Sequence, residues 1–387
     1  MFTPGVLPQT PSVHPLKRVS PSRFFSLTEC PLREVWGASR QQPLLPNSPA
    51  ARLGSVIHRL LEISGKGLIK NSDPVEIQHV WEGLVRNTEQ EMEESWLERA
   101  LVPLERTVPQ YEVRRIRACT RAEEILSARA SAGMIEAERR SRRFETWIET
   151  NDGLVGGTID EIQESDAGAV LRDYKSGYIM TAELERGATE IDRKYSLQLK
   201  LYAALFASKY QRWPVRIEIV PLQGPAQVVP FNPSECEALL NQAVSILNEL
   251  NRRINRQLRS TDQAANDGEF ANPTPANCRF CLFRPSCKSY RASRELSGST
   301  DWPRDIWGTV SEFRLLGNGR LTLAITDRDK KTIRVRGLTA TSKRHPAVEV
   351  IREGEDVAIF NLRGKIDRGD FTESQSTVIY SVPMKTL

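Results

Sequence analysis

The sequence contains no long apolar run. No stretch approaches the roughly 20 consecutive apolar residues that a membrane-spanning helix requires. The first eight residues lack the basic start and apolar core of a signal peptide. The mean hydropathy of -0.42 and hydrophobic content of 39% over 387 residues are those of a soluble globular protein with room for two domains. We therefore expect a cytoplasmic protein with no membrane partner.

Two further features limit the classes of function that the sequence allows. No G-x4-G-K-[ST] phosphate-binding loop occurs, so the chain is not itself a P-loop helicase, and an ATPase partner would have to supply any unwinding. The net charge of +5 is too small to indicate a nucleic-acid-binding protein by itself. Arginines are nevertheless locally dense, as at Arg139 and Arg140. They could neutralise phosphates along a groove or form a solvated surface.

The segment from Gly156 to Lys175 predicts a β-hairpin that carries two carboxylates and a lysine. Apolar residues occur on both sides of a turn-rich stretch, 164–168. Because side chains alternate along a strand, Asp173 and Lys175 should lie on one face of the second strand. If Asp160 of the first strand faces the same side, the three groups converge. Two carboxylates with room for water suit Mg²⁺ or Mn²⁺.

A metal site of this kind indicates phosphodiester hydrolysis, although the Asp-x-Lys pattern alone also describes an ordinary ion pair. Residues 54–62 predict an amphipathic helix with His58 at the edge of its apolar stripe. A neutral imidazole there could complete the metal shell or simply be packed. Gln198 and Tyr202 lie four apart on a predicted helix and share a face. That face could contact the DNA backbone, support the lysine or be a half-buried polar edge.

Three of the six cysteines form a C-x2-C-x5-C group, Cys278, Cys281 and Cys287. Thiolates so closely spaced in a loop are suitable ligands for a soft metal. A closed site needs a fourth ligand, and Cys30 is the candidate. The spacing alone does not distinguish zinc from an iron-sulfur cluster.

The order of these segments resembles the RecB-type nucleases of the PD-(D/E)XK superfamily over most of residues 20–290. The matching blocks are 20–24 with Cys30-Pro31, 54–58, 157–160, 173–177 and 198–202. The resemblance implies an α/β restriction-endonuclease-like core, in which helices flank a mixed sheet. By the same resemblance, His58, Asp160 and Asp173 match ligands for one or two Mg²⁺ or Mn²⁺ ions. The matching catalytic and motif residues are Asp160, Asp173, Lys175, Gln198 and Tyr202.

The same resemblance also indicates which metal group the cysteines bind. Iron-sulfur members of this nuclease group, including AddB-type and CRISPR adaptation nucleases, place one cysteine before the histidine block and a C-x2-C-x5-C triplet after the core. The resemblance therefore implies a 4Fe-4S cluster held by Cys30, Cys278, Cys281 and Cys287, with structural zinc as the alternative. Such a cluster would close a very long loop and restrict the unfolded chain as a cross-link does.

Changes in composition divide the chain into three parts. Residues 1–19, rich in proline, predict an extended arm. Residues 20–296 form the predicted nuclease domain, with 74–131 as a helical insertion before the sheet. Residues 297–387 predict an all-β domain that resembles an OB-fold barrel. Its predicted strands are 307–315, 320–326, 332–337, 356–362 and 376–382, with a helix near 346–352.

The OB-like domain suggests a second binding surface. Basic and aromatic residues there, including Arg344, Phe360 and Phe371, could engage a single strand. A small barrel used for protein contact or stability is the alternative. Glu138, ahead of the hairpin, is either an accessory acid or a surface glutamate.

These features predict a metal-dependent DNA nuclease. The expected substrate is single-stranded or end-containing DNA, in repair, recombination or phage defence. The alternative is a non-catalytic nucleic-acid-binding or scaffold subunit of a larger helicase-nuclease assembly.

Overall fold

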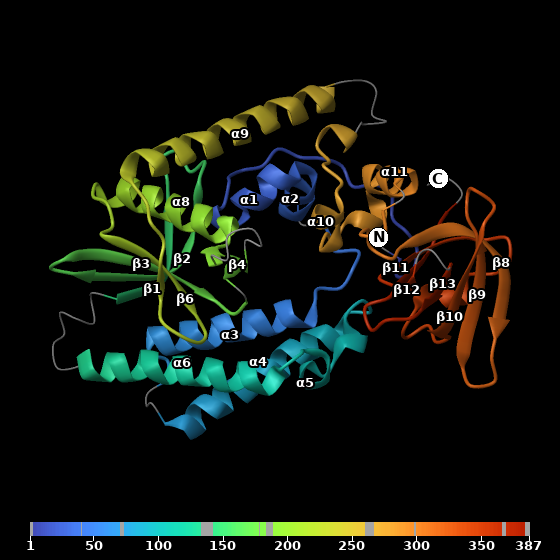
Figure 1. Cartoon of the computed structure of the whole chain (residues 1–387), viewed down its shortest axis with the longest axis horizontal. Helices are drawn as coiled ribbons and strands as arrows, with labels where there is room; N and C mark the ends of the chain where they lie inside the picture. Colours follow the sequence, from blue (N-terminus) through green and yellow to red (C-terminus); the bar gives the residue numbers. More distant parts are fainter. Residues whose placement is uncertain are drawn as a thin grey trace.

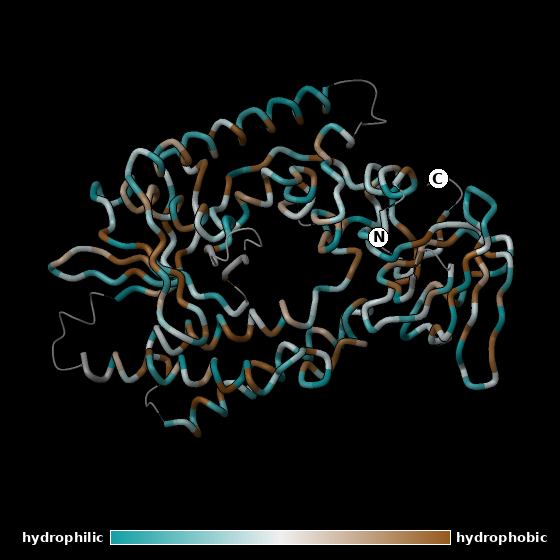
Figure 2. The backbone as a smooth tube through the Cα atoms, in the orientation of Figure 1, coloured by the Kyte–Doolittle hydropathy of each residue, from teal (hydrophilic) through white to brown (hydrophobic). Residues whose placement is uncertain are grey.

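The computed structural model describes residues 3–39, 41–69, 73–132, 142–177, 179–182, 189–259, 267–297, 299–365 and 369–383. Within these ranges the chain forms a mixed sheet between helices and a separate C-terminal all-β unit (Figure 1). Apolar positions follow the strands of both units, while polar positions alternate with apolar ones along the outer helices (Figure 2). None of the described helices is both long and apolar enough to cross a membrane.

The sheet of the first unit has five strands in the order β1-β2-β3-β6-β7. The strands are β1 (Arg142–Glu149), β2 (Gly156–Ser165), β3 (Gly168–Lys175), β6 (Arg216–Pro221) and β7 (Gln227–Val228). β3 and β6 are parallel, whereas the other neighbouring pairs are antiparallel. The sheet is therefore mixed, as predicted, and β2 and β3 form the expected hairpin.

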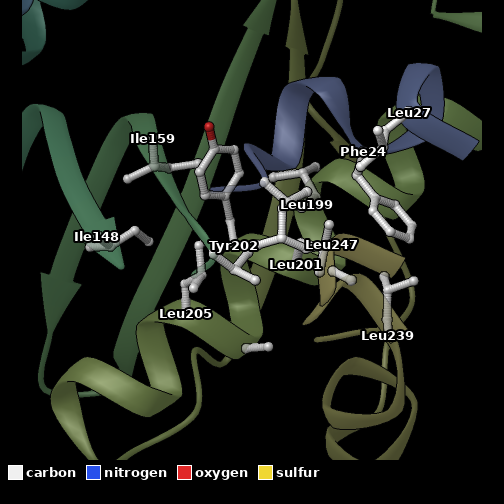
Figure 3. Packing of buried hydrophobic residues seen from close by; sticks show 14 of the residues in the cluster. Phe24, Leu27, Ile148, Ile159, Leu199, Leu201, Tyr202, Leu205, Leu239 and Leu247 are labelled. Carbon is white, nitrogen blue, oxygen red and sulfur yellow. The ribbon is translucent and has the colours of Figure 1, made fainter. Parts of the chain in front are cut away.

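One face of this sheet is covered by α8 (Arg193–Tyr210), α9 (Pro233–Arg259), α1 (Pro21–Glu29) and α2 (Pro31–Ala38). Figure 3 shows Tyr202 and Leu205 of α8 next to Ile148 and Ile159 of the strands, with Leu247 of α9 to the right of Tyr202. All five side chains are buried. Burial of such side chains contributes about 1.5–3 kcal/mol each relative to exposure, which fixes α8 against the sheet.

The other face is covered by α3 (Pro49–Lys66), α4 (Pro74–Glu94) and α6 (Tyr111–Ala132). α3 begins where the Ser48 side chain accepts a hydrogen bond from the amide of Ala51 and ends at Gly67, which has a φ of 70°. The predicted segment 74–131 is helical, with η1 (Arg99–Leu101) and α5 (Leu104–Thr107) between the long helices. Its apolar residues pack with α3 against the sheet, so it builds the second helical layer.

The C-terminal unit has seven strands in the order β12-β13-β10-β9-β8-β11-β14. They are β8 (Ile306–Leu315), β9 (Arg320–Thr326), β10 (Thr332–Thr339), β11 (Asp356–Phe360), β12 (Arg363–Lys365), β13 (Asp370–Thr372) and β14 (Val378–Ser381). The five predicted strands are confirmed. β12 and β13 were not predicted, because each has only three residues, too few for an alternating pattern of apolar and polar residues to be recognised. The predicted helix near 346–352 is the short η4 (Pro346–Glu349).

The N-terminal arm is extended, as predicted, and it contacts both units. Val6 forms a parallel bridge with Ser381 of β14, and Leu7 donates a 2.9 Å main-chain hydrogen bond to the Ser381 carbonyl. Val19 forms a second bridge, to Val155 just before β2. The arm thus links the all-β unit to the five-stranded sheet.

The remaining described elements are short except for α11. They are β4 (Met180–Ala182), β5 (Thr189–Ile191), η2 (Asp267–Glu269), α10 (Pro275–Arg279), η3 (Arg284–Ser286) and α11 (Lys288–Leu296). The last three carry the C-x2-C-x5-C group between the two units.

Candidate active site

The two predicted carboxylates lie at the end of the β2-β3 hairpin. Glu161 pairs with Arg172, so Asp160 and Asp173 are the next opposed positions on the two strands. The main-chain amide of Tyr174 donates a 2.6 Å hydrogen bond to Oδ2 of Asp160. The phenol of Tyr174 instead donates to Glu161 on the other face of the sheet, so the predicted alternation along β3 is confirmed.

The carboxylate of Asp173 is buried beside two polar groups. Its side chain is only 4% exposed, and its Oδ1 accepts a 2.7 Å hydrogen bond from Nε2 of Gln198. Its Oδ2 lies 2.6 Å from Nζ of Lys175. Among the described residues, no hydrogen bond of ordinary geometry reaches that Oδ2. Asp173 therefore keeps one buried oxygen whose only neighbour of opposite charge is Lys175.

The imidazole of His58 approaches the hairpin from α3. Its Nδ1 lies 3.8 Å from Oδ2 of Asp160. Burial lowers the pKa of His58, and the positive charge of Lys175 lowers it further. The ring is therefore neutral near physiological pH, which is the form that binds a metal ion.

The two carboxylates of the site repel each other. Burial raises the pKa of Asp160 well above its ordinary range, and the negative charge of Asp173 adds to this shift. Among the described residues, no three His, Cys, Asp or Glu side chains are arranged as a ready-made metal cluster. The carboxylates are instead engaged by the amide of Tyr174, by Gln198 and by Lys175. A buried carboxylate oxygen without a hydrogen bond and a neutral imidazole nevertheless offer donor atoms that suit a hard divalent cation.

Gln198 and Tyr202 both face the hairpin from α8. Gln198 is 7% exposed and Tyr202 is 2% exposed. The Tyr202 hydroxyl donates a 2.6 Å hydrogen bond to the carbonyl of Thr158, two residues before Asp160. Both side chains are therefore used by the protein: they position Asp173 and β2, and neither presents a surface to a DNA backbone as the sequence suggested.

The four predicted cluster cysteines line one pocket although they are far apart in the sequence, but among the described residues they are not arranged as a ready-made metal cluster. Cys30 lies between α1 and α2, whereas Cys278, Cys281 and Cys287 lie in and around α10 and η3. All four line one cavity of about 20 Å³ and none forms a disulfide. Burial raises the pKa of Cys287 to about 12, and the thiols of Cys281, Cys278 and Cys30 contribute to this shift. Four thiols around one largely apolar cavity are a donor set that suits a soft metal.

The sequence model of the PD-(D/E)XK nuclease superfamily matches residues 18–288. The chain belongs to this superfamily. No curated protein matches it significantly. Solved structures do match, among them the crystal structure of SSO0001, which is 12% identical and aligns over 46% of this chain and 78% of that one. The TM-score of that alignment is 0.22, too low to support any statement about the fold.

The PD-(D/E)XK motifs include the acids of the hairpin, but they do not include Glu145, an acid on the neighbouring strand β1. Glu145, in β1, has a left-handed backbone with a φ of 49°, which costs a non-glycine residue about 1–2 kcal/mol. Burial raises its pKa, and the negative charge of Glu62 raises it further. Sequence reasoning missed Glu145 because it reads as one more polar position in an arginine-rich strand. Three residues named from the sequence, Glu138, Arg139 and Arg140, lie outside the described residues.

The predicted nucleic-acid surface of the C-terminal unit needs correction. Phe360 and Phe371 are buried in its cores, so neither is available to stack on a base. Arg344 forms a 3.2 Å ion pair with Glu373 and is itself largely buried. The sequence left them as candidates for a binding surface because alternation marks strands without showing which aromatic side chains are buried.

Proposed function

We propose that this PD-(D/E)XK chain is a Mg²⁺- or Mn²⁺-dependent DNA nuclease. The observation that carries the proposal is the buried Oδ2 of Asp173, which lies 2.6 Å from Nζ of Lys175. Among the described residues, no group donates a hydrogen bond to this oxygen. Asp160 stands opposite Asp173, and His58 approaches from the other side. This is the donor set that a catalytic divalent ion needs beside an ammonium group.

Asp160, Asp173 and His58 would hold one or two ions. A bound ion would polarise the phosphodiester and lower the pKa of a coordinated water. Lys175 is held in place by its ion pair with Asp173 and by the ring of Tyr195, whose centroid lies 5.1 Å from Nζ. From there its ammonium can orient the attacking water or stabilise negative charge on the phosphate. Gln198 and Tyr202 act as positioning residues, because they hold Asp173 and β2.

We further propose that Cys30, Cys278, Cys281 and Cys287 hold a 4Fe-4S cluster, with structural zinc as the alternative. The shared cavity of the four thiols and the RecB-like order of the motifs support this assignment. The cluster would join the loop after α1 to the segment that leads into the C-terminal unit. Its role would be to stabilise that junction.

The strand pairing of the C-terminal unit supports an OB-like barrel. β8, β9 and β10 form an antiparallel meander, β10 is parallel to β13, and β11 pairs with both β8 and β14. This is the connectivity of a small Greek-key barrel with a short helical turn before its fourth strand. We propose that the unit binds single-stranded DNA or contacts a protein partner.

The RecB-like motifs favour single-stranded or end-containing DNA as substrate, in repair, recombination or phage defence, with an ATPase or helicase partner where long duplexes must be unwound. The competing function is a non-catalytic subunit of such an assembly. The joint presence of Asp160, Asp173 and Lys175 at one point favours catalysis.

The deciding experiment incubates the full chain with end-labelled single- and double-stranded DNA and Mn²⁺. We expect cleavage by the wild-type protein and loss of it in Asp173→Ala and Lys175→Ala. Equal cleavage by Asp173→Ala would reject the site. Absence of cleavage by the wild type on every substrate, with DNA still bound, would favour the non-catalytic subunit. The lengths of the labelled products also separate endonuclease from exonuclease action.

A further inference from the structure

Glu145 occupies the position on β1 that faces the proposed metal site. Phe144 pairs with Glu161 and Thr146 pairs with Ile159, so the intervening residue falls opposite Asp160. Asp160 in turn stands opposite Asp173 on the next strand. Three carboxylates, Glu145, Asp160 and Asp173, therefore form a row across β1, β2 and β3.

The backbone at Glu145 departs from the strand around it. Its φ of 49° is left-handed, although the residues on both sides keep a regular register with β2. A glutamate rarely adopts this conformation. Here the side chain lines a cavity of about 530 Å³ together with His58, Glu62 and Ser176. Glu145 and His58 thus reach the same space from β1 and α3.

The charges in this cavity are unevenly compensated. Glu62 forms 2.6 Å ion pairs with both Arg59 and Lys66. Within the described ranges, no hydrogen bond or ion pair involves the carboxylate of Glu145. Asp173 has a buried Oδ2 that no hydrogen bond reaches in the same part of the chain, and Lys175 is its only close cation. Within the described ranges, the three carboxylates thus share one cation in direct contact, Lys175, whereas Glu62 alone contacts two.

We propose that Glu145 is a further metal-binding residue, which supplies a carboxylate oxygen to the divalent cation on the cavity side of Asp160. This inference rests on the proposed nuclease function, because it concerns the same ion. Oδ2 of Asp173, which accepts no hydrogen bond among the described residues, and Nδ1 of His58, 3.8 Å from Oδ2 of Asp160, offer donor atoms to a cation at this place independently of Glu145. The raised pKa of Glu145, caused by burial and then by the charge of Glu62, agrees with a carboxylate that gains from a nearby cation.

The test measures Mn²⁺ binding to the full chain without DNA, from the electron paramagnetic resonance signal of free Mn²⁺. Glu145→Gln removes the charge and keeps the shape. Glu62→Gln is the matched control, because it removes the same charge from the same cavity at a residue already compensated by Arg59 and Lys66. Asp173→Asn reports on the proposed site itself. Glu145→Asn is a second variant, since asparagine tolerates a left-handed backbone.

We expect Glu145→Gln and Glu145→Asn to raise the Kd for Mn²⁺ by about tenfold or more, whereas Glu62→Gln changes it by less than about threefold. The melting temperature of the metal-free Glu145 variants should equal or exceed that of wild type, because a repulsive charge is removed. Wild-type affinity in both Glu145 variants, with binding lost in Asp173→Asn, would overturn the inference and leave the nuclease site intact. An equal loss in Glu62→Gln would also overturn it, because the effect would then be one of general charge. Unchanged binding in Asp173→Asn would overturn the proposed metal site and the inference with it.

Discussion

Nε2 of Gln198 donates a 2.7 Å hydrogen bond to Oδ1 of Asp173, across the space between α8 and β3. This contact fixes the orientation of the carboxylate and leaves its Oδ2 facing Lys175. It explains why a glutamine one helix beyond the hairpin belongs to the site. Gln198 therefore sets the direction of the carboxylate.

The first prediction follows from that contact. Gln198→Ala should lower kcat for DNA cleavage by roughly 10–100-fold, because Asp173 loses its orienting donor, while KM for DNA changes little. Single-turnover cleavage of a labelled oligonucleotide over a range of DNA concentrations measures both quantities. Gln211→Asn is the control: it lies just beyond the same helix, and asparagine tolerates its φ of 56°. A change in KM alone would mean that Gln198 contacts the substrate.

The site was predictable from sequence as far as periodicity could locate its residues. Strand alternation placed Asp173 and Lys175 on one face, and helical spacing placed Gln198 and Tyr202 on another. Neither pattern shows the depth of burial. Contact with DNA was therefore left open for Tyr202, although its hydroxyl is used in a hydrogen bond to the carbonyl of Thr158. Glu145 was missed because its role depends on a left-handed φ and on its register with β2, neither of which is visible in a single sequence.

The fold, too, could be predicted only where a local pattern in the sequence marks its elements. The hairpin and the five main strands of the C-terminal unit carry local alternation, and the structure confirms them. The docking of the arm at Ser381 depends on main-chain hydrogen bonds between residues more than 370 positions apart. Such pairing leaves no periodic signature, so only an extended arm could be predicted.

A second prediction concerns pH and the metal-free protein. Burial and Asp173 raise the pKa of Asp160 in the folded state above its unfolded value. Between these two pKa values the folded state binds more protons, so stability falls as pH rises through that window. Asp160→Asn should therefore raise the melting temperature of the metal-free protein above that window, by roughly 2–4 °C for each kcal/mol recovered. Below the pKa that Asp160 has in the unfolded state, wild type and Asp160→Asn should have the same melting temperature.

Differential scanning calorimetry from about pH 3 to pH 9 in the presence of EDTA measures this dependence. Added Mn²⁺ should stabilise wild type but not Asp160→Asn, because a ligand that binds the native state raises its melting temperature. A lower melting temperature of Asp160→Asn at every pH would contradict the prediction. It would show that the carboxylate of Asp160 stabilises the fold by more than its burial and its repulsion by Asp173 destabilise it.

A third prediction concerns the four clustered cysteines. Cys281→Ser should abolish bound iron and the broad visible absorption of an iron-sulfur protein, and should lower the melting temperature of the anaerobically purified chain. Cys119→Ser is the control, since Cys119 lies on α6 and is not one of the four thiols around the cavity. Metal analysis and visible spectra decide the outcome. If the wild type contains zinc without iron, the four cysteines form a structural zinc site in place of the cluster. If it contains neither metal, the assignment is rejected.

The last prediction concerns the junction between the cysteine group and the C-terminal unit. The guanidinium of Arg284, between Cys281 and Cys287, lies 2.6 Å from Oδ2 of Asp305, and both side chains are buried. Arg284 also donates to the side chain of Asn361, and Tyr290 donates to Asp305. Removing one partner leaves a buried charge unpaired, which costs about 3–5 kcal/mol. The C-terminal unit should therefore lose its attachment in Asp305→Asn.

Limited proteolysis between residues 297 and 305, together with urea unfolding, measures this loss. Asp305→Asn should be cut faster than wild type, while Arg291→Ala should not. Arg291 is the matched control because its ion pair with Glu295 on α11 is partly exposed, and such pairs contribute only about 0–1 kcal/mol. Equal protection of Asp305→Asn and wild type would mean that the arm and the apolar contacts hold the unit without the buried pair. In that case the pairing of Leu7 with Ser381 is the attachment to disrupt next.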